Sequence, residues 1–240
     1  SLRVGCSSGT ASSVPVSASS AAESTVSSVE ETASSAVDEN EAAAAQLLND
    51  LTGSYQELWP VILADEYKQT WLDDCTALVG EDNAEAAFEK LSSMVTGDVY
   101  GEDAVKAYAN GGGAYFCGFT NSLATLTFDG ETSTISGTDK DGNVLFSHTY
   151  HYIGMEPVHG LYEFESDDAD SGEFTYFFLA PDTSAETYHI EFRYGSDAEA
   201  LSQYDAGEYA YWVASGISTD CDQTMIDNCI ELFCTENLAG

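Results

Sequence analysis

The chain has 240 residues, of which 42 are Asp or Glu and only 6 are Lys or Arg, so its formal net charge is −36. A surface this acidic repels nucleic acid and anionic lipid headgroups, which excludes both as partners. No apolar run approaches the roughly 18 residues that a membrane-spanning helix needs, so a covalent lipid would be the one means of attachment to a membrane.

The first 45 residues are rich in Ser and Ala and hold almost no large apolar side chains. Such a segment buries too little surface to offset the entropy of ordering it, so it is predicted to be a flexible tether. Residues 46–240 are expected to form one folded domain. Gly5 and Cys6 before the tether resemble the processing site of a bacterial lipoprotein. This resemblance implies export, with a lipid anchor at Cys6 at the cell surface; a periplasmic or secreted protein is the alternative.

The next quarter of the chain has helical character. Residues 41–51, EAAAAQLLNDL, combine good helix formers. Further along, apolar side chains recur at helical spacing in a segment that the glycines of residues 111–113 bring to an end. These side chains are Ala87, Phe88, Leu91, Met94 and Val95.

Beyond residue 113 the sequence breaks into seven short runs rich in aromatic and β-branched residues, which predict strands. The runs cover residues 114–119, 123–128, 132–137, 143–153, 161–166, 173–180 and 187–195. Asp129-Gly130, Asp141-Gly142 and the loop of residues 167–172 supply turn formers between them, so neighbouring strands should be antiparallel.

Near the C-terminus, an apolar stripe predicts a helix that closes over the strands. It consists of Met225, Ile226, Cys229, Ile230 and Phe233. The whole pattern predicts a mainly β fold, a calycin or lipocalin-like antiparallel barrel with flanking N-terminal and C-terminal helices.

Five cysteines follow the tether, and their spacing does not form the close pairs of a zinc finger. They are Cys75, Cys117, Cys221, Cys229 and Cys234. In an oxidising compartment they could supply two disulfides with one thiol left over, and the spacing leaves the pairing open.

The sequence lacks a GxSxG elbow, a phosphate-binding glycine loop and an HExxH motif. This inventory predicts that the protein is not an enzyme.

One strand carries a candidate metal-binding pair. Because side chains alternate along a strand, His189 and Glu191 should point to the same side of the run 187–195. An imidazole and a carboxylate two residues apart can chelate zinc or another divalent ion, although a site normally has three or four ligands. Metal affinity should fall below about pH 6.5, where imidazole becomes protonated. The alternative is a structural histidine beside a solvent-facing Glu.

Several segments in the same order resemble the ZinT (YodA-like) family of zinc-binding calycins. The segment LTGSYQELWPVIL retains the family's Gly, Gln and Pro as Gly53, Gln56 and Pro60, with aromatic Tyr55 and Trp59 at matching places. The family's YxYxG pattern recurs as Tyr150, Tyr152 and Gly154, and its RYLFE-like strand resembles residues 161–165.

The motifs that carry the family's metal ligands also have counterparts in this sequence. Its HIIAP and HFHIFxG motifs resemble FFLAP at residues 177–181 and HIEFRYG at residues 189–195. Carried over by position, the resemblance puts His189 and Glu191 at two ligand positions and Phe177 at the third. It does not tell whether metal binding survives with Phe177 there. A further ligand could come from His148, His151 or His159; because His148 and His151 lie three apart, at most one can face a given site.

The resemblance implies an extracytoplasmic protein that binds zinc, or cadmium, and scavenges the metal or delivers it to the binding component of a zinc ABC importer. The alternative is a metal-free calycin at the surface, in which Phe177 fills the pocket and the domain binds an apolar ligand or a protein partner.

Overall fold

A computed structural model describes residues 39–181 and 189–240. Residues 1–38 of the predicted tether and Cys6, with the expected lipid anchor, lie outside the described residues, whereas residues 39–45 of that segment are helical rather than a flexible tether. Residues 39–50 are helical, and Ala44, Leu47 and Leu48 from this helix are buried. Folded residues therefore begin before position 46, where the domain was predicted to start.

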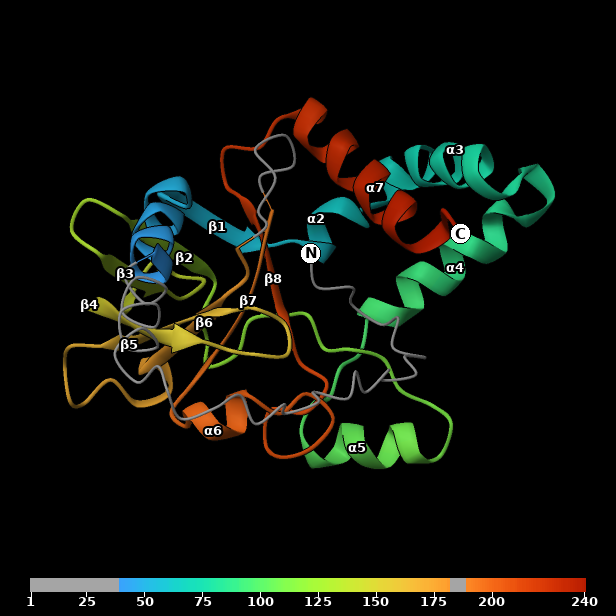
Figure 1. Ribbon diagram of the computed structural model, residues 1–240. Coiled ribbons are helices and arrows are strands. Elements are labelled where there is room, and N and C mark those ends of the chain that lie inside the picture. The colour runs from blue at the N-terminus through green and yellow to red at the C-terminus, as the bar shows by residue number, and fades with distance from the viewer. Residues whose placement is uncertain (1–38, 182–188) are drawn as a thin grey trace, which may run out of the picture.

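Eight antiparallel strands form a closed barrel in chain order, with β8 returning to pair with β1. This confirms the predicted fold class, a calycin-like barrel with flanking helices (Figure 1). The strands are β1 (Gly53–Glu57), β2 (Thr125–Asp129), β3 (Thr134–Thr138), β4 (Val144–Met155), β5 (Tyr162–Ser166), β6 (Tyr176–Leu179), β7 (His189–Gly195) and β8 (Ala214–Ser218).

The predicted turns join the hairpins. Gly142 has φ 83° between β3 and β4, and Gly172 has φ 54° between β5 and β6, both in the left-handed region that glycine adopts without strain. The run 114–119 does not form a strand; it contributes only isolated bridges from Phe116 to Thr96 and Trp212. The eighth and first strands were not expected from the sequence.

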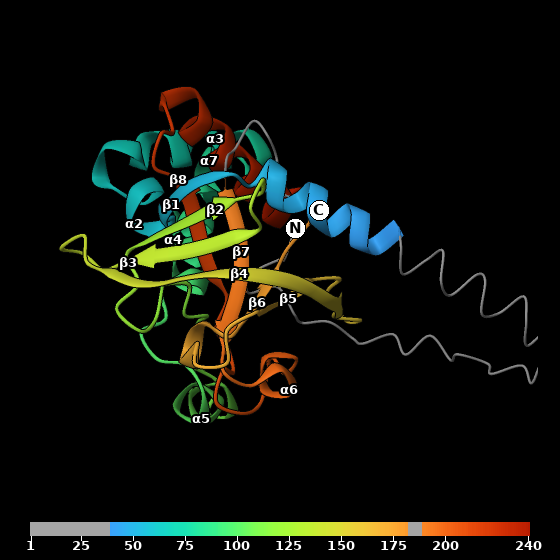
Figure 2. The same ribbon diagram turned by 90° about the vertical axis from the view of Figure 1, so that its left-hand side faces the viewer.

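The helices lie outside the barrel. They are α2 (Trp59–Ile62), α3 (Lys68–Val79), α4 (Glu81–Val95), α5 (Glu102–Ala109), α6 (Ala198–Leu201) and α7 (Gln223–Leu238), with short 3₁₀ turns at Asp65–Tyr67 and Gly172–Phe174. In both views α3, α4 and α7 stand together on one side of the barrel, away from α5 and α6 (Figures 1 and 2). Among the described residues, no helix is long and apolar enough to cross a membrane.

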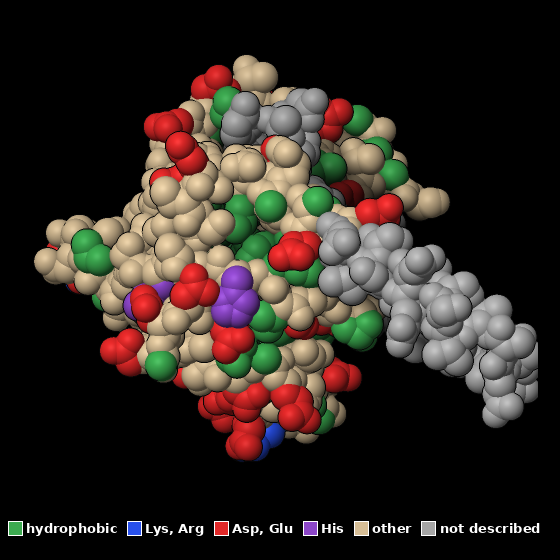
Figure 3. Space-filling view, turned by 60° about the vertical axis from the view of Figure 1, so that its left-hand side comes forward, with side chains coloured by type: hydrophobic (Ala, Val, Ile, Leu, Met, Phe, Trp, Pro, Cys, Tyr) green, Lys and Arg blue, Asp and Glu red, His purple; other side chains and the backbone are tan. Residues whose placement is uncertain are grey.

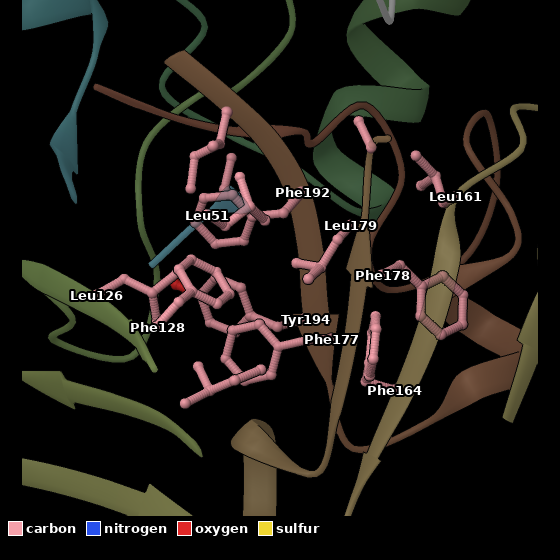
Figure 4. Close-up of a cluster of buried hydrophobic side chains, with 14 of the residues drawn as sticks. Leu51, Leu126, Phe128, Leu161, Phe164, Phe177, Phe178, Leu179, Phe192 and Tyr194 are labelled. Carbon is pink, nitrogen blue, oxygen red and sulfur yellow. The ribbon is translucent and has the colours of Figure 1, made fainter. Parts of the chain in front are cut away.

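Two apolar clusters hold the fold together. The first fills the barrel and is dominated by aromatic rings, among them Phe128, Phe164, Phe177, Phe192 and Tyr194 (Figure 4). The second lies between the outer face of the barrel and the helices, where Ile217 of β8 packs with residues of α2, α3, α4 and α7. The predicted C-terminal helix belongs to this second cluster, because Ile226, Cys229 and Phe233 of α7 are buried there.

Candidate metal centre

Strand β7 positions the candidate pair. All seven of its residues are buried, so both faces of this strand are covered. Phe192 and Tyr194 stack against Phe177 inside the barrel, with ring centroids 6.4 Å and 5.3 Å from it. Side chains alternate along the strand, so His189 and Glu191 share the outer face, toward the helices. The predicted common face is therefore present, and it lies outside the lumen.

His189 lies between the barrel and α7. Its side chain is buried, and its ring centroid is 5.4 Å from that of Phe233, with the planes tilted by 60°. Burial penalises the charged imidazolium and lowers the pKa of His189 from 6.5 to about 4. The ring is consequently neutral at neutral pH, which is the form that binds metal ions.

Glu191 is also buried, opposite Ser215 of the neighbouring strand β8. Its negative charge acts on two buried thiols. Burial and then the Glu191 carboxylate raise the pKa of both Cys117 and Cys229 above the ordinary thiol value. Both cysteines are therefore protonated at neutral pH in the metal-free protein.

The two thiols come from distant parts of the chain. The segment around Cys117 runs alongside the start of β8, where the Ser215 amide donates to the Cys117 carbonyl at 3.1 Å. Cys229 projects from α7 in the second apolar cluster. Sequence spacing gave no indication of these positions, because they result from the pairing of the Cys117 segment with β8 and from the packing of α7 on the barrel.

Two further polar atoms are buried beside Cys117. Trp59 Nε1 and Ser215 Oγ act as weak hydrogen-bond partners of the Cys117 thiol, an effect that opposes the rise in its pKa. Neither atom has a hydrogen-bond partner of ordinary geometry among the described residues. A buried polar atom without a good partner costs about 1–3 kcal/mol, so this region retains unused hydrogen-bonding capacity.

A surface pocket of about 340 Å³ reaches this region from outside. Cys117 and Trp59 belong to its wall, together with the apolar side chains of Leu63, Val95 and Phe116. Glu57 contributes a carboxylate, which accepts a hydrogen bond from the Phe119 amide at 2.7 Å. The pocket therefore gives small molecules or ions access to the Cys117 side of the buried cluster.

Phe177 does not stand beside the pair, contrary to the position that the sequence resemblance gives it. In the register of β6 and β7, Phe177 lies opposite Tyr194, whereas Phe178 lies opposite Arg193. Phe177 thus shares the lumen face with Tyr194, and Figure 4 shows Phe177 and Phe178 pointing to opposite sides of β6. Phe177 fills the barrel and leaves the outer face of β7 unobstructed by its ring.

The three other histidines make separate contacts. His148 Nδ1 lies 2.6 Å from Asp168, and His151 Nδ1 lies 2.6 Å from Asp167. His159 lies in the loop after β4, with its ring centroid 4.0 Å from that of Tyr204. None of these contacts joins His189 and Glu191.

The donor types at the pair suit zinc, because imidazole nitrogen, carboxylate oxygen and thiolate sulfur are its usual ligands. Their arrangement does not form a complete metal site. In residues 39–181 and 189–240, no three His, Cys, Asp or Glu side chains are grouped so that they could hold one ion. The described residues therefore do not assemble three such donors around His189 and Glu191.

No protein-family model matches the sequence, and no curated protein matches it significantly. Among solved structures, the chain is similar to the Zn(II)-bound ZinT-like domain of Streptococcus pneumoniae AdcA, with 16% identity, a TM-score of 0.46, and coverage of 75% of this chain and 87% of that one. It is also similar to Zn(II)-bound AdcA from the same organism, with 15% identity and a TM-score of 0.44. This second match covers 80% of the chain but only 35% of AdcA. At these values the likeness does not identify a ligand for this chain.

Proposed function

We propose that the protein binds a divalent metal ion, zinc first and cadmium by the same chemistry, with His189 and Glu191 as ligands. The observation that supports this is the burial of both side chains on one face of β7, with the imidazole neutral and the carboxylate acting electrostatically on two buried thiols. A buried imidazole, carboxylate and thiol together form a donor set that favours zinc over calcium or magnesium, which take oxygen ligands.

Cys117 is the preferred third ligand. It lines the pocket, as Glu57 does, and the Glu191 carboxylate acts electrostatically on its thiol. Metal binding would release its proton, because a thiol coordinates zinc as the thiolate. Cys229 is the alternative third ligand from α7.

The charge of the chain supports capture of a cation. Acidic side chains are spread over the face shown in Figure 3, where Lys and Arg scarcely appear. A net charge of −36 raises the local concentration of cations around the molecule, which speeds their arrival at any site. This effect is unspecific, so selectivity must come from the buried donors.

Isothermal titration of zinc into chelator-treated protein tests the proposal. One saturable equivalent is expected for the wild type and none for the double variant His189→Ala, Glu191→Ala. The matched control is His151→Ala, Glu165→Ala, because it removes an exposed pair whose Nε2 and Oε2 atoms are 3.7 Å apart. Equal zinc binding by the wild type and the β7 variant would contradict the proposal, as would loss of binding in the control alone.

Cobalt substitution identifies the third donor. Co²⁺ bound to a thiolate shows a sulfur-to-metal charge-transfer band in the near ultraviolet, which nitrogen and oxygen ligands do not give. We expect this band in the wild type, its loss in Cys117→Ser, and its retention in Cys229→Ser and in the control Cys221→Ser. Loss only in Cys229→Ser would assign the ligand to α7 instead.

For the cellular role, we propose an extracytoplasmic, non-enzymatic protein that scavenges the metal or delivers it to the binding component of an importer. Fractionation of cells that express the full-length protein tests the location. Labelling with a radioactive fatty acid, compared between wild type and Cys6→Ser, tests the proposed lipid anchor.

The pocket supports a second candidate function, the binding of a small apolar ligand. Its walls are largely apolar, and the single carboxylate of Glu57 would favour a ligand with a cationic or hydrogen-bond donor group. This pocket lies between the barrel wall and the helices, whereas aromatic rings fill the barrel itself. Saturable binding of a hydrophobic fluorophore, reduced by Leu63→Trp and unaffected by the exposed control Leu78→Trp, would favour this function.

A further inference from the structure

Two buried cysteines face each other where α3 packs against α7. The Sγ atoms of Cys75 and Cys234 are 4.0 Å apart, although the residues are 159 positions apart in sequence. Both side chains are fully buried, within the apolar cluster that fixes the helices to the barrel. Their sulfur atoms already lie in van der Waals contact.

We propose that Cys75 and Cys234 form a disulfide bond that ties α3 to α7. Bringing the sulfurs from 4.0 Å to the length of a disulfide, about 2.05 Å, requires a movement of roughly 2 Å. Rotation about χ1 of one or both cysteines supplies a movement of this size without unpacking either helix. Both helices are continuous, and neither contains a glycine or proline between its ends.

The other described cysteines occupy different environments. Cys117 and Cys229 are buried where the Glu191 carboxylate acts on them electrostatically, and Cys221 is partly exposed just before α7. Cys75 and Cys234 thus have each other as partners, which leaves Cys117 and Cys229 as thiols. The cysteine count alone does not lead to this pairing.

The reaction is a thiol–disulfide exchange with an external disulfide such as oxidised glutathione. The two protein thiols lose two protons and two electrons and form one S–S bond, while the external disulfide takes them up and becomes two thiols. Burial raises the pKa of both cysteines, so neither is a good nucleophile in the folded state. The bond should therefore form during folding, while the sulfurs are still accessible.

The bond would fix α3 to α7 in the layer of helices that covers β7. Helix α7 carries Phe233, which packs against His189, and Cys229, which is buried in the second apolar cluster. A link across a long loop also restricts the unfolded chain and stabilises the folded state by this route. The inference does not depend on metal binding, because it rests on the packing of α3 with α7.

Peptide mapping tests the pairing. The full chain carrying Cys6→Ser and Cys221→Ser, which removes competing accessible thiols, is refolded from the reduced unfolded state in a glutathione redox buffer. The folded protein is then denatured, alkylated and cleaved with a protease specific for acidic residues, without reduction. We expect one cross-linked species that joins the peptides of Cys75 and Cys234, with alkylated Cys117 and Cys229. Free Cys75 and Cys234, or their linkage to other cysteines, would overturn the proposal.

Thermal unfolding supplies an independent measurement. Reduction should lower the Tm of the oxidised protein by roughly 5–15 °C, the shift expected for the loss of a long-loop disulfide in a domain of this size. In the same background, Cys75→Ala, Cys234→Ala should show no effect of reductant on Tm. If this variant does not fold, the peptide map of its parent still decides the pairing.

Discussion

The rings of His189 on β7 and Phe233 on α7 meet across the interface between the barrel and the helices, with centroids 5.4 Å apart. Phe233 packs in turn on Trp59, at 4.6 Å between centroids. Phe233 therefore shields His189, the candidate ligand, and also contacts Trp59, one of the residues that line the pocket. The chemistry of the pair depends on how tightly α7 closes over the barrel.

The first prediction concerns pH and stability of the metal-free protein. His189 has a folded pKa of about 4 against 6.5 when unfolded, so between these values the unfolded chain binds more protons and stability falls as pH falls. The loss should reach about 3 kcal/mol by pH 4. The ring of Phe233 on α7 packs against this imidazole.

Urea denaturation of chelator-treated protein from pH 7.5 to 4 measures this effect. His189→Gln should lack this part of the pH dependence, whereas the exposed control His151→Gln should retain it. Parallel pH curves for wild type and His189→Gln would show that the imidazole is not held neutral by burial. The same low pKa predicts that protonation of His189 weakens zinc binding only near pH 4, and not below 6.5 as an ordinary imidazole would.

Removal of the shielding ring is the second prediction. Phe233→Ala should destabilise the protein by about 3–5 kcal/mol, because it leaves a cavity between α7 and the barrel. Water that enters the cavity should raise the pKa of His189 toward its ordinary value, as followed by NMR titration of the imidazole protons. The exposed control Leu78→Ala should change neither quantity. If Phe233→Ala leaves the pKa of His189 unchanged, burial by Phe233 is not the cause of its low value.

The third prediction tests whether Phe177 lies inside the barrel rather than at a ligand position beside His189 and Glu191. If Phe177 stood at a ligand position, Phe177→His would restore a three-ligand site and raise zinc affinity. Because Phe177 packs inside the barrel against Tyr150 and Tyr194, we expect no gain in affinity and a loss of stability of several kcal/mol. Phe177→Leu serves as the control for lost packing alone. A clear gain in zinc affinity in Phe177→His would contradict the observed register.

Periodicity and turn residues were sufficient to predict most of the barrel, but they missed the strands that close it. Strand β8, ASGIS, has little of the bulk that marks a strand. The reason is packing: a Cβ on Gly216 would lie 3.1 Å from the Ile190 side chain and 3.3 Å from that of Tyr55. Its small residues accommodate large neighbours, and a pattern based on strand propensity does not register this.

The candidate site was predictable only in part, for a different reason. Alternation along one strand placed His189 and Glu191 together, and it also placed His148 and His151 on different faces, where they contact Asp168 and Asp167 separately. Alternation cannot relate Phe177 to His189, because the register of two strands depends on the turn between them and on their partners. The positions of Cys117 and Cys229 depend on the pairing of the Cys117 segment with β8 and on the packing of α7, and the local sequence gives no signal for either.

The last prediction concerns Arg193, which follows the pair on the outer face of β7 and is fully buried. Its guanidinium donates to the carbonyls of Leu201, Gln203 and Tyr209, the last at 2.5 Å, and lies 4.3 Å from the centre of the Tyr204 ring. One side chain thus satisfies three carbonyls of the segment after α6 and holds that segment against the barrel.

Arg193→Met keeps much of the volume but removes every donor, so it should destabilise the protein by about 3–5 kcal/mol. Arg193→Lys should cost less, because it keeps the charge and some donors but loses the planar fork that reaches several carbonyls at once. Urea midpoints at constant m-value measure the loss, and hydrogen exchange should rise first in residues 201–209. The exposed control Lys90→Met should stay within about 0.5 kcal/mol of wild type. A similarly small effect of Arg193→Met would mean that packing, rather than the guanidinium, orders this segment.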